Sequence, residues 1–151
     1  SMRFNVFHPN RVQALILQGC GPGYRSEEPR AQWNQRVSGR AKIILKDGYE
    51  ALNGASEVPA SLQRSNKELA MAANGILAQI DAKVIDSLTT IAVPTLVIIG
   101  ESDTYYLKGS DYMASRIPGS YHVVVPDAGH GVNIDKPIIV NKAFEEFLDK
   151  L

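Results

Sequence analysis

Cysteine and histidine are scarce in this sequence. Cys20 is the single cysteine among 151 residues, so a disulfide within the chain is excluded. A lone cysteine is typical of a protein from a reducing compartment, and we expect a cytoplasmic location. The three histidines, at positions 8, 122 and 130, are scattered along the chain. Because this spacing matches no metal-binding motif, the sequence predicts no metal site.

The sequence also has no excess of charge of one sign and no long apolar run. Sixteen Lys and Arg residues balance sixteen Asp and Glu residues, and no basic cluster stands out. We therefore expect neither a nucleic acid nor a membrane surface as a partner. The apolar runs are well short of the roughly 20 residues that span a membrane. The remaining composition, 44% hydrophobic and 21% charged, is typical of one globular domain with a sizeable core.

Three short apolar runs predict strands of a parallel sheet. Residues 95–99 are apolar or β-branched throughout and lie between Pro94 and Gly100, as expected for a strand buried on both faces. Similar runs occupy residues 122–125 and 12–18, again bounded by proline or glycine turns. The sequence therefore predicts an α/β fold.

An ionisable residue follows each of two of these runs. Asp103 comes just after residues 95–99, and His130 lies in a glycine-flanked turn after residues 122–125. Loops at the carboxyl ends of strands in open α/β sheets carry the groups that meet ligands. A histidine there can act as a general base if a carboxylate holds its other nitrogen, and Asp103 is the natural candidate. On this spacing alone, an exposed loop histidine and a turn aspartate remain the commoner explanation.

Several linked segments resemble the closing part of the α/β-hydrolase superfamily. They are Val-Pro-Thr-Leu-Val-Ile-Ile-Gly-Glu-Ser-Asp at 93–103, Arg-Ile-Pro-Gly-Ser at 116–120, Val-Pro-Asp-Ala-Gly-His at 125–130 and Asn-Ile-Asp-Lys-Pro at 133–137. In that family the acid of a Ser-His-Asp triad follows the penultimate strand and the histidine follows the last one. By this resemblance Asp103 matches the acid and His130 the base. The implied fold is the C-terminal part of an α/β-hydrolase, with about three parallel strands flanked by helices.

The middle of the chain predicts helices instead of strands. Residues 27–52 carry an amphipathic stripe that ends at Asn53-Gly54; its members are Trp33, Val37, Ile44, Leu45, Tyr49 and Leu52. A capping-box pattern at Ser65–Glu68 opens a second helix, and residues 81–88 favour a short third one. The apolar positions of the second helix are Leu69, Ala72, Ala73, Ile76, Leu77 and Ile80.

The resemblance also implies a domain organisation. Residues 3–23 and 88–151 would form the C-terminal part of the hydrolase core, and residues 24–87 a helical cap, or lid, over the active site. Trp33 is a candidate substrate contact in this lid. In the core segment we expect two further helices, at residues 105–117 and 137–151, the second of which should pack on the sheet.

No residue of the chain fits the triad nucleophile well. Ser102 lies in a turn that half matches the Gly-x-Ser-x-Gly elbow, but Thr104 replaces the second glycine and the resemblance assigns this turn to the acid. Cys20 lies between two glycines after a predicted strand, yet a buried structural cysteine explains it better. The glycine-rich turn at 19–23 lacks the Lys-Ser/Thr of a phosphate loop, and we expect no cofactor.

The resemblance implies a serine-type hydrolase of a small ester, lactone or similar acyl substrate, with the nucleophile and the oxyanion hole upstream of this chain's first residue. Three apolar parallel strands would leave a long unpaired edge along residues 12–18. We therefore expect the missing N-terminal half, or a second copy of the chain, as a partner. A non-catalytic binding module derived from a hydrolase is the alternative, and haloalkane dehalogenation by an aspartate nucleophile is a weaker one.

Overall fold

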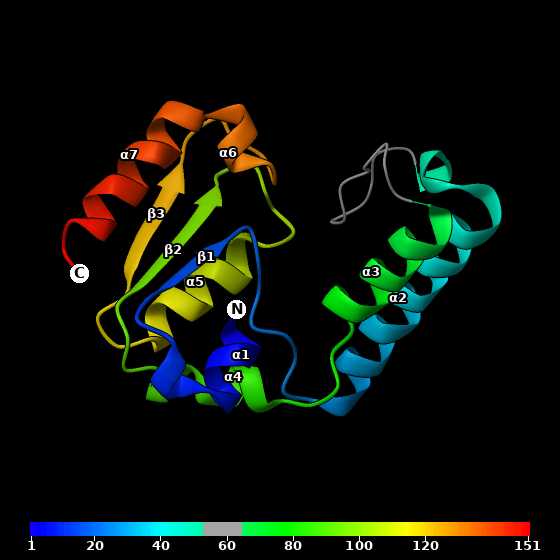
Figure 1. Cartoon of the computed structure of the whole chain (residues 1–151), viewed down its shortest axis with the longest axis horizontal. Coiled ribbons are helices and arrows are strands. Elements are labelled where there is room, and N and C mark those ends of the chain that lie inside the picture. The colour runs from blue at the N-terminus through cyan, green and yellow to red at the C-terminus, as the bar shows by residue number, and fades with distance from the viewer. Residues whose placement is uncertain (53–64) are drawn as a thin grey trace. The chain divides into compact units, whose positions relative to one another are not determined.

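The computed structural model describes residues 1–52 and 65–151 and divides the chain into two compact units. The first unit comprises Ser1–Gly23 together with Lys83–Leu151, and the second comprises Tyr24–Ala82. The first contains a sheet with helices packed on it, and the second contains a pair of helices (Figure 1).

A three-stranded parallel sheet organises the first unit. Its strands are β1 (Leu15–Gln18), β2 (Thr95–Gly100) and β3 (Tyr121–Val125), in the order β1-β2-β3. The register pairs Leu15 with Thr95 and Leu96 with Tyr121, and both pairs of strands are parallel. The predicted α/β fold with about three parallel strands is confirmed.

The central strand β2 is buried along its whole length because both faces of the sheet are covered. On one face Leu17 and Val97 pack with Met113 of α5 (Leu107–Arg116). On the other face Ile98 packs with Val140 of α7 (Pro137–Leu148). Full burial of each such side chain contributes roughly 1.5–3 kcal/mol, so these two clusters hold the sheet between its helices. Figure 1 shows α5 and α7 lying along the sheet.

The outer strands β1 and β3 are less protected. Tyr121 and Val124 of β3 are each more than two-fifths exposed. His122, on the same strand, has its Nε2 3.6 Å from a carboxylate oxygen of Asp111. Among the described residues, β1 has a strand partner on one side only, which is β2.

The helix α2 (Glu27–Asp47) is shorter than predicted. It ends at Gly48, whose φ of +87° is a backbone conformation that residues with a side chain rarely adopt. A 3-10 turn at Tyr49–Leu52 follows. The expectation of an unbroken helix to residue 52 is therefore wrong, and the predicted stop at Asn53-Gly54 falls partly outside the described residues.

The helix α3 (Asn66–Leu77) begins at the predicted capping box. The backbone N–H of Glu68 donates to the Ser65 hydroxyl at 3.3 Å, and the Ser65 backbone N–H donates to the Glu68 carboxylate at 2.7 Å. These reciprocal bonds satisfy donors at the helix start that have no partner within the helix.

The second unit has its own small core between α2 and α3. Leu69 and Ala73 of α3 pack with Ala41 and Ile44 of α2. Three residues of the predicted apolar stripes are instead exposed by more than half, namely Leu45, Ile76 and Ile80. The buried stripe is therefore narrower than the sequence predicted.

Short elements connect the larger ones in the first unit. They are α1 (Met2–Phe7), a 3-10 turn at Pro9–Arg11, α4 (Lys83–Ser87), a 3-10 turn at Leu88–Thr90 and α6 (Val132–Asp135). α4 agrees with the short helix expected in residues 81–88, whereas α1 and α6 were not predicted. His8 follows α1 as a turn residue. None of the helices in the described ranges has the length and apolar character needed to cross a membrane.

Candidate active site

Asp103 and His130 lie together at the carboxyl ends of β2 and β3. Asp103 is in the turn after β2, and His130 is in the turn after β3. The distance between Oδ2 of Asp103 and Nδ1 of His130 is 2.7 Å. The Asp103 side chain is only 4% exposed, whereas that of His130 is 42% exposed. The arrangement is a buried carboxylate that orients a solvent-accessible imidazole.

The carboxylate of Asp103 is held from both sides. Its Oδ1 accepts the backbone N–H of Tyr106 at 3.3 Å, which leaves Oδ2 for the imidazole. The backbone N–H of Asp103 donates to the Gly100 carbonyl at 3.0 Å, closing a tight turn directly after β2. The backbone therefore fixes the direction in which the carboxylate faces.

The turn that carries His130 packs closely against the carboxyl end of β2. The Ser102 N–H donates to the Ala128 carbonyl at 2.9 Å, and the Gly129 N–H donates to Oδ2 of Asp135 at 2.7 Å. A Cβ atom at Gly100 would overlap the carbonyl oxygens of Ala128 and Gly129. Only glycine permits this approach of the two turns.

Two residues that the sequence did not single out lie close to His130. The ring of Tyr106 stacks on the imidazole, with 5.0 Å between ring centroids and 30° between the planes. A Cβ atom at Gly19, which follows β1 with φ +53°, would lie 3.5 Å from Nδ1 of His130. The available signals were an aromatic residue just after the acid turn and the glycine-rich turn at 19–23, but neither specifies a histidine as its contact.

The hydrogen bond to Asp103 assigns different tasks to the two nitrogens of His130. Nδ1 carries the proton that is donated to the carboxylate, so Nε2 is the nitrogen with a free lone pair. Within residues 1–52 and 65–151, Nε2 has no hydrogen-bond partner. The imidazole can therefore accept a proton from a hydroxyl brought to its exposed edge.

The two weak nucleophile candidates do not meet this imidazole. Neither Ser102 nor Cys20 forms a hydrogen bond with His130 in the described part of the chain. Burial raises the pKa of the Cys20 thiol from 9.0 to about 11. A thiol with such a pKa stays protonated near neutral pH, which is the reverse of what a nucleophilic cysteine needs.

Trp33 belongs to the second unit. Its indole N–H donates to the Leu77 carbonyl at the end of α3, at 2.6 Å, and its ring lies 6.2 Å from that of Tyr24. The hydrogen bond links α2 to the end of α3. No group of three His, Cys, Asp or Glu side chains in residues 1–52 and 65–151 is arranged to hold a metal ion.

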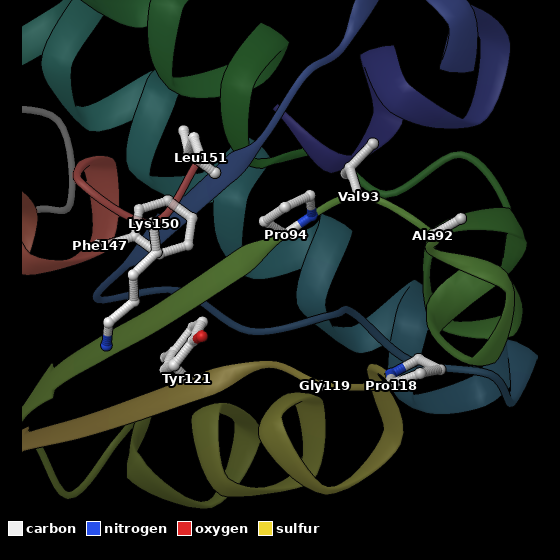
Figure 2. Close-up of a pocket in the computed structure, with 9 residues that line it drawn as sticks. All are labelled: Ala92, Val93, Pro94, Pro118, Gly119, Tyr121, Phe147, Lys150 and Leu151. Atoms are coloured by element: carbon white, nitrogen blue, oxygen red, sulfur yellow. The ribbon is translucent and has the colours of Figure 1, made fainter.

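A pocket of about 250 Å³ lies at the amino ends of β2 and β3 (Figure 2). Asp103 and His130 instead follow the carboxyl ends of these strands. It is lined by Ala92, Val93, Pro94, Pro118, Gly119, Tyr121, Phe147, Lys150 and Leu151. Open α/β sheets bind ligands at the carboxyl ends of their strands. This pocket is therefore distinct from the candidate active site.

Comparison with known proteins finds a relative of similar sequence and several solved structures of similar fold. No protein-family model matches the chain. A Bacillus subtilis (strain 168) protein, described as a candidate 2-succinyl-6-hydroxy-2,4-cyclohexadiene-1-carboxylate synthase, is 28% identical over 167 positions, which cover 98% of this chain and 61% of the relative. The chain thus spans about three fifths of that relative's length.

Solved structures of similar fold also match nearly the whole chain. MenH from S. aureus superposes with a TM-score of 0.81 at 20% identity, covering 99% of this chain and 65% of that one. A thermophilic esterase from Thermogutta terrifontis superposes with a TM-score of 0.79 at 25% identity, covering 99% of this chain and 60% of the esterase. With its parallel sheet and these matches, the chain has the α/β-hydrolase fold and corresponds to the C-terminal part of that fold.

Proposed function

We propose that the chain is the C-terminal segment of a serine-type α/β-hydrolase that acts on a small ester, lactone or similar acyl substrate. The observation that carries the proposal is the 2.7 Å contact between Oδ2 of the buried Asp103 and Nδ1 of the exposed His130. In this proposal His130 is the general base and Asp103 keeps it in the correct tautomer.

The chemistry follows from the two nitrogens of His130. Nε2 takes the proton of a serine hydroxyl as the serine oxygen attacks the acyl carbon, and returns it to the leaving group as the tetrahedral intermediate collapses to an acyl-enzyme. The same base then takes a proton from a water that attacks the acyl carbon, and returns it to the serine oxygen as the acid is released. Asp103 remains ionised and stabilises the imidazolium that forms between these steps. The serine and the oxyanion hole come from outside this sequence.

The partner in this proposal is the N-terminal half of a hydrolase or a second copy of the chain. Two observations support it. The chain covers only about 60–65% of the solved structures that it matches, and β1 has a strand partner on one side only among the described residues. A strand added beside β1 would pair the free backbone groups of that edge.

Residues 24–87 would form the lid in this proposal, with Trp33 as a candidate substrate contact. Support comes from the compactness of Tyr24–Ala82 as a unit with its own helix pair. Because lids in this superfamily shape substrate choice, substitutions at Trp33 would alter KM more than kcat.

Replacing the general base gives the direct test. In the assembled hydrolase, His130→Ala should reduce kcat for an aryl ester by at least 10³-fold, since no other group would accept the serine proton. Asp103→Asn should reduce kcat by a similar order, because an amide no longer holds the required tautomer. Initial rates with p-nitrophenyl acetate measure both effects.

His122→Ala is the matched control for this test, because His122 lies on β3 but contacts Asp111 instead of the candidate site. Its rate should stay within about twofold of the parent, as expected for an exposed residue outside the site. Unchanged turnover in His130→Ala would remove His130 from the mechanism.

A non-catalytic binding module is the second candidate, favoured by the lack of a nucleophile joined to His130 among the described residues. A fluorophosphonate probe separates the two. It should label a serine in the assembled protein if the chain serves a hydrolase, and nothing if it is a binding module.

The activity for which the Bacillus subtilis relative is named is a third candidate, supported by 28% identity over nearly the whole chain. It would use the same base for a different reaction. Turnover of the corresponding synthase substrate without turnover of aryl esters would favour this assignment over ester hydrolysis.

A further inference from the structure

We propose that Tyr106 is a positioning residue for His130, and that the glycine turn at residues 19–23 supports Tyr106 in that role. The inference rests on the proposed function of His130 as a general base. In this role Tyr106 restrains the face of the imidazole, and Asp103 restrains its Nδ1.

The stacking geometry supplies the first argument. The hydrogen bond between Nδ1 and Asp103 restrains the imidazole at one ring nitrogen. The ring of Tyr106 lies over the imidazole at 5.0 Å between centroids and 30° between planes, within the range of a favourable offset stack. The His130 side chain is 42% exposed, so solvent reaches part of the ring. Tyr106 therefore limits the directions in which Nε2 can point.

The glycine turn supplies the second argument. A Cβ atom at Gly21 would lie 3.8 Å from the Tyr106 ring, and one at Gly109 would lie 3.3 Å from the backbone of Gly21. The fully buried Ser110 donates its hydroxyl proton to the Cys20 carbonyl at 3.1 Å. The turn thus runs closely against the start of α5, immediately after Tyr106.

Gly19, in the same turn, lies close to the imidazole itself. A Cβ atom at this position would lie 3.3 Å from the backbone oxygen of His130 and 3.5 Å from Cε1 and Nδ1 of its ring. The turn after β1 therefore bounds the space of both rings of the stack. Three strand ends take part, with Gly19 after β1, Asp103 and Tyr106 after β2, and His130 after β3.

The stack would act at the proton-transfer step. When Nε2 takes the serine proton, the imidazole becomes a cation, and an aromatic face attracts a cation placed over it. Tyr106 would hold the same ring orientation while the proton is received and while it is returned. Its effect should therefore fall on kcat and leave substrate binding largely unchanged.

Kinetics of the assembled hydrolase test this role. Tyr106→Val should lower kcat roughly tenfold with KM within about twofold, because a misplaced catalytic group slows the reaction without weakening binding. In Tyr106→Phe, kcat should stay within about twofold of the parent value, since phenylalanine keeps the aromatic ring. The matched control is Tyr105→Val, because Tyr105 is half exposed and its ring contacts Tyr106 instead of His130.

A second readout needs no nucleophile. In proton NMR of the chain, the Nδ1–H of His130 should give a downfield signal, assigned by its loss in His130→Ala. Tyr106→Val should broaden this signal through faster exchange with water, whereas Tyr106→Phe and Tyr105→Val should keep it. Amide spectra confirm that each variant is folded, and Tyr106→Leu replaces Tyr106→Val if the latter does not fold.

The outcomes separate this inference from the proposed function. An unchanged Nδ1–H signal and unchanged kcat in Tyr106→Val would overturn the positioning role, and so would equal losses in Tyr106→Val and Tyr106→Phe. Unchanged hydrolysis in His130→Ala would instead refute the general base, while the Nδ1–H signal would still decide whether Tyr106 orients the ring.

Discussion

Cys20 shows at the scale of one residue how burial decides chemistry. It follows β1 by two positions and lies in the turn that borders His130, but burial raises its pKa from 9.0 to about 11. Burial favours the neutral thiol, so the folded chain resists deprotonation more than the unfolded chain. The free energy of unfolding therefore keeps its full value with respect to this thiol below pH 9. It falls as pH rises toward 11, because the unfolded chain loses the proton first.

Alkylation kinetics test the state of this thiol. At pH 8 the folded chain should react with iodoacetamide roughly 100-fold more slowly than the chain in urea, because a rise in the pKa of Cys20 from 9.0 to about 11 reduces the thiolate fraction by about that factor. Cys20 is the single cysteine, so mass spectrometry follows one site. Equal rates in the folded and unfolded chain would contradict the burial argument.

The candidate site was predictable in part. Asp103 and His130 were candidates because each follows an apolar run in a turn, and parallel strands bring such turns together. The spacing alone favoured an exposed histidine and a turn aspartate, and the resemblance to α/β-hydrolases selected the pair. Tyr106 and Gly19 could not be predicted, because their closeness to His130 joins segments that are 24 and 111 positions apart in the numbering. A contact of that kind depends on the strand order and on where a backbone comes close, neither of which leaves a local sequence pattern.

Among the elements, β2 was easier to predict than the helix boundaries, whereas β1 begins at Leu15, three residues after the start of the predicted run 12–18. β2 is buried on both faces, so its apolar run has no competing explanation. The helix α2 ended early because Gly48 left the helical conformation, although the apolar spacing continued past it. Ile76 keeps helical spacing yet is 73% exposed. Periodicity shows which positions share a face but not how much of that face has a neighbour to pack against.

The capping box of α3 offers a test at this scale. Ser65→Ala removes the hydroxyl that accepts the Glu68 N–H and should lower the free energy of unfolding by about 1 kcal/mol. Ser26→Ala is the matched control, because Ser26 stands at the start of α2 without a side-chain cap. Urea unfolding followed by circular dichroism measures both. An equal effect of the two substitutions would mean that the capping box adds nothing to α3.

For the whole molecule, we expect assembly to depend on the edge of β1 that has no strand partner among the described residues. The N–H groups of Leu15 and Gly19 donate toward β2, to the carbonyls of Pro94 and Ile98. Since N–H directions alternate along a strand, the N–H of Ile16 points to the open side. An apolar strand with free donors and acceptors on one side is a site for pairing with another chain.

Removing one donor from that edge tests the predicted partner. Ile16→Pro deletes an N–H on the open side and spares the bonds to β2, a position where a strand tolerates proline. The parent chain should elute from size exclusion well above its 16.5 kDa, or bind a hydrolase N-terminal half, and Ile16→Pro should lose this association. Ile16→Val keeps the N–H and should associate like the parent. A parent chain that stays a stable monomer without any partner, or an Ile16→Pro variant that associates equally well, would show that assembly does not proceed through β1.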